Sequence, residues 1–243
     1  HNFSGTALAS DFKIHGKLPL FNLDKDATSH VEWKNLMLEK LPLAKDLAWI
    51  PTQGKVSGSL SLTGPIPKEK EPFPGKLEVD FQVEDLLLKP TDGAHPIEVI
   101  RLTGHGDFNQ GLLQYEIHTT VWGSDFDIKG KLQMGQGRPV LNSRINWQGL
   151  DVSQLPLPST GWQASEGKLT GTLTLIGPIP GAGEKFPGQL KTSLKFAAKN
   201  LKLQKKSSPD SPLLALNQLT GAGEFANHQV IYNIKGGTFK GTF

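Results

Sequence analysis

The sequence predicts a mainly β protein, built as one long, curled antiparallel sheet. Apolar residues alternate with polar ones along many segments, which is the pattern of strands with one apolar face. The 27 glycines and 17 prolines lie mostly between those segments, where turns are expected. The whole pattern also occurs twice, at a spacing of 113 to 117 residues. We therefore expect about two structural repeats that extend the same sheet.

The repeat is clearest in one strand phrase. GKVSGSLSLTGPIP begins at Gly54 and GKLTGTLTLIGPIP begins at Gly167, 113 residues later. LTGHGDF at Leu102 is matched 117 residues later by LTGAGEF at Leu219, and a four-residue insertion in the loop KKSSPDSPL accounts for the larger offset. The sequence thus predicts three segments: the end of a preceding unit with a short helix (1–53), a first unit with a short helix near 150–157 (54–166), and a second unit truncated at its C-terminal end (167–243).

Several local features refine this prediction. The alternation shifts by one residue near Glu84 and Asp85, which indicates a β-bulge. A hairpin turn is expected at Gly123 and Ser124, and the two GPIP elements end strands. WKNLMLEKLPLAKDL and WQGLDVSQLPLPS are predicted to be short helical inserts, one per repeat, that cap one end of the sheet.

The apolar face of these strands is the candidate functional surface. The sheet must either fold over into a sandwich whose side chains cover this face, or form an open trough with an apolar groove. The composition does not decide between the two. The recurring Trp33 and Trp147 are expected to pack in the core, or else to contact an apolar ligand at the mouth of a groove. The candidate lining residues are Val56, Leu60, Leu62, Leu77, Val79, Phe81, Leu113, Tyr115, Ile117, Phe126, Ile128, Leu169, Leu173, Leu175, Leu190, Leu194, Phe196, Tyr232 and Ile234.

Sequence features of enzymes are missing. The chain has no Cys and no GxSxG or HExxH motif. Its paired carboxylates are interpreted as charged groups exposed to solvent. His105 and Asp107 share strand parity but have no third ligand at a convincing spacing, so we expect no metal and no cofactor. A net charge of +3 does not call for a nucleic-acid partner. The absence of Cys weakly favours an oxidising compartment.

The repeated segments resemble those of one known protein family. The repeats resemble the periplasmic repeats of the AsmA-like proteins of Gram-negative bacteria, the group that includes AsmA and TamB. The residues that carry the resemblance are Gly167, Leu169, Gly171, Leu173, Leu175 and Gly177, then Gly123, Ser124, Phe126 and Ile128, and then Leu150, Val152 and Leu155.

The resemblance implies a function without catalysis. It implies a periplasmic segment of a protein anchored in the inner membrane, with a curled sheet that binds the acyl chains of phospholipids. The implied task is phospholipid transfer between the inner and outer membranes, or outer-membrane homeostasis. The alternative from the residues alone is a structural or adhesive β-repeat protein with a closed core filled by side chains. The N-terminal membrane helix of the family is not part of this sequence.

Overall fold

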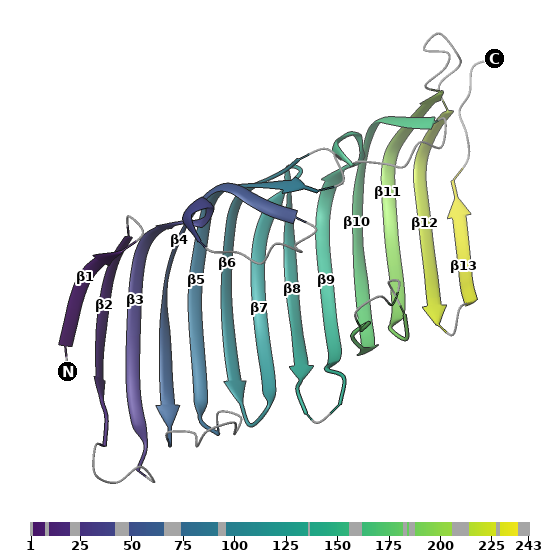
Figure 1. The fold of residues 1–243 in the computed structure, drawn as a ribbon. Coiled ribbons are helices and arrows are strands. Elements are labelled where there is room, and N and C mark those ends of the chain that lie inside the picture. The colour runs from purple at the N-terminus through teal and green to yellow at the C-terminus, as the bar shows by residue number, and fades with distance from the viewer. Residues whose placement is uncertain are drawn as a thin grey trace. The chain divides into compact units, whose positions relative to one another are not determined.

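The computed structural model of the chain is almost entirely β-sheet (Figure 1). It describes residues 2–7, 10–19, 25–41, 49–65, 74–91, 96–135, 137–155, 162–181, 184, 188–205, 214–226 and 229–237. The strands are β1 (Asn2–Ala7), β2 (Ser10–Lys17), β3 (Ala27–Met37), β4 (Trp49–Gly64), β5 (Lys76–Pro90), β6 (Ile97–Asn109), β7 (Leu112–Val121), β8 (Ser124–Gln133), β9 (Val140–Asp151), β10 (Trp162–Pro178), β11 (Lys191–Lys205), β12 (Leu214–Ala226) and β13 (Gln229–Gly236). Two 3-10 turns, η1 (Leu38–Lys40) and η2 (Val152–Gln154), complete the list.

The strands form one sheet in the order of the chain, from β1 to β13. The sheet is antiparallel and open, since it does not close into a barrel. This confirms the predicted fold class. The topology is the simplest one for antiparallel strands, because each strand pairs with the next along the chain.

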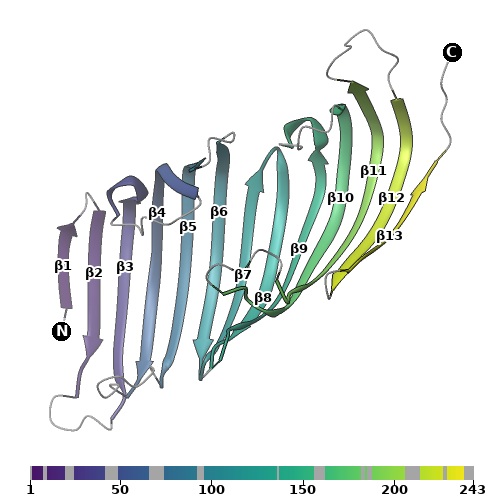
Figure 2. The same cartoon turned by 45° about the vertical axis from the view of Figure 1, so that its right-hand side comes forward.

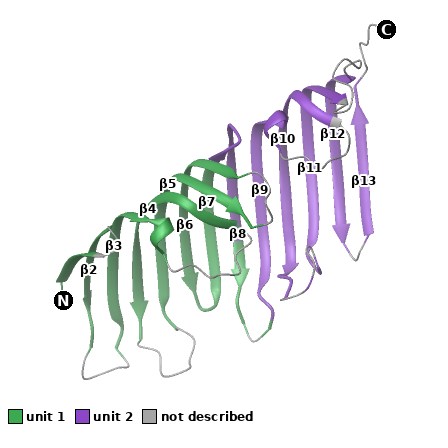
Figure 3. Cartoon of the chain, turned by 45° about the horizontal axis from the view of Figure 1, so that its top comes forward, with its two compact units in different colours: residues 1–119, 131–137 green, residues 120–130, 138–243 purple. Residues whose placement is uncertain are grey.

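The chain divides into two compact units (Figure 3). Unit 1 consists of residues 1–119 and 131–137, and unit 2 of residues 120–130 and 138–243. Within each unit the strands lie side by side in a single layer, and a short turn bends over one end of the sheet (Figure 2). The described residues of neither unit contain a second sheet or a long helix.

The predicted helical inserts are wrong. The first segment continues as β3, where Leu36 pairs with Val56 and Met37 with Lys55, and only Leu38–Lys40 form a 3-10 turn. The second segment continues as β9 and ends in the equally short η2. A single turn cannot satisfy its own backbone groups as a strand ladder does, and the following prolines prevent a longer helix. Residues 42–47 and 156–159 of these segments lie outside the described residues.

The predicted bulge and the strand ends at the two GPIP elements are confirmed, and the predicted hairpin turn lies one residue earlier than Gly123 and Ser124. Asp85 has a φ of 53° and Asn200, at the matching place on β11, has a φ of 52°. The register between β4 and β5 shifts opposite this bulge. Between β7 and β8, Trp122 and Gly123 have φ values of 51° and 65°, which is the two-residue hairpin geometry with both φ angles positive.

Strand pairing corrects the expected position of the insertion. Gly58 pairs with Phe81 in the first repeat, and Gly171 pairs with Phe196 in the second. The offset is thus 113 residues for the glycines and 115 for the phenylalanines, and Gly104 and Gly221 continue the row at an offset of 117. The four extra residues are therefore divided equally between the loops before and after β11, rather than lying in the second loop alone.

Fully buried apolar side chains are few, as expected for a single layer. In unit 2, Val152 of η2 packs with Ala164 and Leu201, and Leu169 and Leu219 lie against this cluster. In unit 1, the Leu38 side chain of η1 lies close to Gly54 and Leu86. Each 3-10 turn thus covers one end of the apolar face in its own unit, which is the capping position that the sequence predicts for the inserts.

Candidate functional site

The apolar face of unit 1 is built by strand register. Paired residues on neighbouring antiparallel strands project to the same side of a sheet. A row of paired residues that runs across several strands therefore lies on one face, either the apolar or the polar one. One such row runs Ile14, Val31, Leu60 and Val79 from β2 to β5. Neighbouring rows add the pairs Val56–Val83 and Leu62–Leu77. Leucine and valine thus meet leucine and valine across successive strands, and their apolar surface is continuous.

Unit 2 repeats this arrangement. Leu173 of β10 pairs with Leu194 of β11, and this row continues to Gly223 and Tyr232. Another row on the same face, beyond that of Gly171 and Phe196, contains Leu169, Ala198 and Leu219. The two units therefore present the same kind of apolar face, so the sequence repeat corresponds to a repeated surface.

The apolar face is only partly shielded from water. Ile14 is 39% exposed, Leu194 is 36% exposed, and Tyr232 is 71% exposed. Among the described residues, η1 and η2 are the only elements outside the sheet, and each covers one end of the face in its own unit. The rest of the face has no covering layer of described residues, whereas a strand in a sandwich core buries one face completely.

Most predicted lining residues lie on this face. The strand register brings together Val56, Leu60, Leu62, Leu77, Val79 and Phe81 in unit 1, and Leu169, Leu173, Leu175, Leu194, Phe196, Tyr232 and Ile234 in unit 2. Leu113, Tyr115 and Ile117 share one face of β7 by alternation, and the Leu113 side chain lies close to Gly106. On β8, the Phe126 ring stacks on Trp147 with 6.2 Å between ring centres, and Ile128 follows two residues later.

One predicted residue differs from the others. Leu190 precedes β11 and is only 3% exposed, so it supports the sheet end instead of offering a binding surface. The backbone beside it approaches Gly177, whose φ of 135° is a conformation that glycine adopts without strain.

The prediction missed a row of aromatic rings and glycines. In unit 1 the row runs Gly5, Phe12, Trp33, Gly58, Phe81 and Gly104, and in unit 2 it runs Trp147, Gly171, Phe196 and Gly221. Each of Gly58, Gly104, Gly171 and Gly221 has an aromatic ring within 2.7 Å of the position of a Cβ. The rings therefore lie flat across the neighbouring glycines and lengthen the apolar surface. The signal was present in the sequence, but only the register reveals it.

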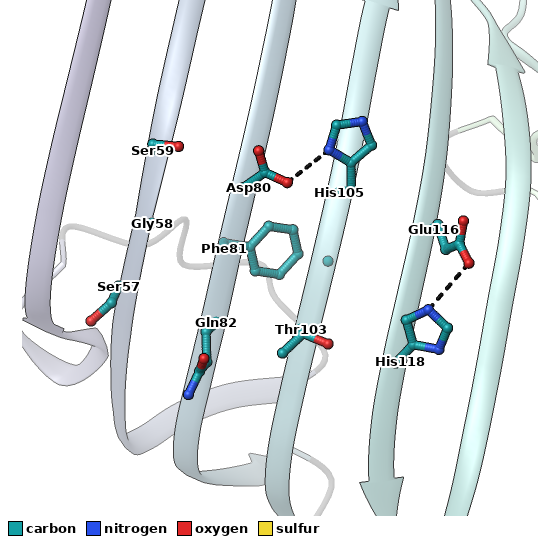
Figure 4. Close-up of a pocket in the computed structure, with 11 residues that line it drawn as sticks. Ser57, Gly58, Ser59, Asp80, Phe81, Gln82, Thr103, His105, Glu116 and His118 are labelled. Atoms are coloured by element: carbon teal, nitrogen blue, oxygen red, sulfur yellow. Dashed lines mark hydrogen bonds and ion pairs between the residues drawn. The ribbon is translucent and has the colours of Figure 1, made fainter.

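The opposite face of the sheet is polar. In unit 1 it carries a shallow depression, in which Asp80 Oδ1 lies 2.8 Å from His105 Nδ1 and Glu116 Oε1 lies 3.2 Å from His118 Nε2 (Figure 4). Ser57, Ser59, Gln82 and Thr103 complete its polar lining. Among the described residues, no group of three or more His, Asp or Glu side chains is placed to hold a metal ion.

One carboxylate of unit 2 has a shifted pKa. Asp151 accepts hydrogen bonds from the Oγ and backbone N–H of Ser153, at 2.6 and 3.0 Å, and pairs with Lys168 at 3.1 Å. These contacts lower the pKa of Asp151, with the Ser153 hydroxyl as the largest cause. The role of this carboxylate is to cap η2, because the turn begins directly after it.

No described helix is long and apolar enough to cross a membrane. The arrangement offers surface for apolar contact on one face and polar depressions on the other. Comparisons of the chain with family models, with curated proteins and with solved structures find no match.

Proposed function

We propose that the apolar face binds the acyl chains of phospholipids. In this proposal the chain is the β-sheet segment of an AsmA-like protein that works in the periplasm, anchored in the inner membrane. Its task is to transfer phospholipid between the inner and outer membranes or to maintain the outer membrane. The observation that carries the proposal is a continuous apolar face that no layer of described residues covers beyond η1 and η2.

The energetics favour this use of such a face. An acyl chain that crosses water exposes its methylenes at about 0.8 kcal/mol each, so a sixteen-carbon chain costs on the order of 13 kcal/mol. Rows of Leu, Val and aromatic side chains on neighbouring strands offset that cost without any catalytic group. Acyl chains have no polar atoms to be recognised, which agrees with a surface that is defined by polarity and register alone.

Lipid binding is tested first by native mass spectrometry of the purified chain, with extraction and identification of bound lipid. We expect co-purified phospholipid, and we expect the delipidated protein to take up a phospholipid with a fluorescent acyl chain. A chain that carries no lipid and takes up none would contradict the proposal and favour a structural role.

Adjacent residues on β10 provide a matched pair of variants. Leu175 lies on the apolar face, where it pairs with Thr192, and Thr174 projects to the polar face, where it pairs with Ser193. Leu175→Glu should reduce uptake of the fluorescent lipid severalfold, whereas Thr174→Glu should leave uptake unchanged, and circular dichroism should report the same sheet content for both. Equal uptake by the two variants would place the lipid elsewhere.

A further inference from the structure

The polar face of unit 2 carries a depression that is related by the repeat to the one in unit 1. Two rows of pairs cross it: Asn146, Thr172, Lys195 and Asn233 lie in the first, and Thr220 and Lys235 lie in the second. We call these six residues the basic depression. Beneath it runs the row of aromatic rings and glycines, with the rings on the other face.

The register fixes which residues of the two depressions correspond. Gly58 and Phe81 align with Gly171 and Phe196, so Asp80 corresponds to Lys195. At the offset of 117 residues, Glu116 corresponds to Asn233 and His118 to Lys235. The chain thus keeps the depression and replaces its carboxylates by an amide and an ammonium group, so the two depressions must attract ligands of different charge.

The charge of the surroundings points the same way. Unit 1 carries 13 Lys and Arg against 16 Asp and Glu, whereas unit 2 carries 13 against 7. Within the described residues of unit 2, Arg138, Lys168, Lys191 and Lys202 each form an ion pair with a carboxylate.

Lys195 and Lys235 make no ion pair in the part of the chain that the structure describes. Of the carboxylates on the same face of unit 2, Glu224 lies 3.9 Å from Lys191, and Asp125 and Asp127 alternate with Phe126 on β8. Two exposed ammonium groups are therefore available beside side chains that both donate and accept hydrogen bonds.

These groups define the chemistry of the ligand. Ammonium groups attract phosphate or carboxylate as point charges, and Thr hydroxyls and Asn amides match sugar hydroxyls. Strand geometry places the Cα atoms of Lys195 and Lys235 about 12 Å apart, so a ligand with several anionic groups can engage both side chains. Nucleic acid is disfavoured, because the aromatic rings of this region face the other side and leave no platform for stacking bases. We propose that the basic depression binds an anionic glycan.

The test uses tetragalacturonic acid as a carboxylated glycan, with maltotetraose as its neutral counterpart, in titration calorimetry of the purified full chain. We expect binding of tetragalacturonic acid that weakens severalfold between 50 and 300 mM NaCl, as for exposed charges. The double variant Lys195→Glu with Lys235→Glu should lose at least about tenfold in affinity. The double variant Lys13→Glu with Lys55→Glu changes the net charge equally in unit 1 and should lose less than about twofold.

Four outcomes would overturn the proposal. They are absence of tetragalacturonic acid binding, equal losses in the two double variants, binding of maltotetraose with the same affinity, and tighter binding of a decathymidine oligonucleotide than of the glycan. The proposal is independent of lipid binding, since the two sites occupy opposite faces. The Lys195→Glu, Lys235→Glu variant should therefore still take up the fluorescent phospholipid, and Leu175→Glu should still bind the glycan.

Discussion

The indole ring of Trp147 lies directly over Gly171 on the neighbouring strand. Its Cζ2 atom is 2.3 Å from the position that a Cβ on Gly171 would occupy, and the backbone oxygen of Lys195 is 2.7 Å from the same point. Trp33 and Gly58 repeat the relationship in unit 1 at 2.7 Å. The glycine is required by the ring across it, since any side chain would have to occupy the volume of the indole.

Gly171→Ala should therefore destabilise unit 2. The added methyl group must displace both a buried ring and a backbone oxygen, and overpacking of this kind costs about 1–3 kcal/mol. Chemical denaturation measures the change, with Gly135→Ala as the control because nothing lies within 4 Å of a Cβ there. A loss for Gly171→Ala no larger than that of the control would show that the ring moves freely.

The bulge residue Asn200 gives a second prediction. Its φ of 52° is a left-handed conformation that costs a β-branched residue more than Asn or Gly. Asn200→Val should destabilise the chain by about 1–2 kcal/mol, and Asn200→Gly should be neutral or slightly stabilising. The same pair of substitutions at Asp85, with a φ of 53°, provides an independent copy of the experiment. Equal stabilities of the Val and Gly variants at both positions would contradict the argument.

A buried serine opens β8 and gives the third prediction. Ser124 is 3% exposed, and its Oγ donates a 2.7 Å hydrogen bond to the backbone oxygen of Gln148. Ser10 is 2% exposed and makes the same bond to Lys34, at 2.6 Å.

Ser124→Ala leaves that buried oxygen without a side-chain donor, so we expect a loss of about 1–2 kcal/mol in the free energy of unfolding. Ser124→Thr keeps the hydroxyl and is the matched control. If the two variants were equally stable, the hydrogen bond would contribute nothing.

The sequence pattern was sufficient to predict the strands, because the alternation of apolar and polar residues is a local property of each segment. It was also sufficient for the bulge at Asp85, where the parity changes. The pattern could not decide between an open sheet and a closed one, since both arrangements require the same alternation of apolar and polar residues. That choice depends on whether a second layer packs on the apolar face, and this is a property of the tertiary structure.

Two of the missed features, the row of aromatic rings and glycines and the opposite charges of the two depressions, depend on register. The contact of Trp147 with Gly171 joins residues on different strands, and a slip of one residue would remove it. The helical inserts were mispredicted because apolar residues spaced by three, such as Trp147 and Leu150 or Val152 and Leu155, also fit a strand followed by one turn, as in β9 and η2. The opposite charges of the two depressions were in the sequence, but aligning Asp80 with Lys195 required the offset of 115 residues from the strand pairs.

The carboxylate of Asp151 gives the last prediction, which concerns pH. Hydrogen bonds from Ser153 and the charge of Lys168 lower its pKa below the ordinary value of 3.8. A group whose pKa is lower in the folded state stabilises that state above its unfolded pKa, and the contribution disappears as the pH falls through the folded pKa. Asp151→Asn should therefore cost about 0.5–1 kcal/mol at pH 7, the range of an exposed helix or turn cap, and should cost less at pH 3.

Urea unfolding of the wild type and of Asp151→Asn at both pH values measures this difference. Ser153→Ala is the informative companion, because it removes the largest cause of the shift and leaves the carboxylate and Lys168 in place. It should reproduce part of the loss at pH 7, and NMR titration should show the pKa of Asp151 closer to 3.8. A cost of Asp151→Asn that is the same at pH 3 and pH 7 would mean that the cap acts through geometry and not through its charge.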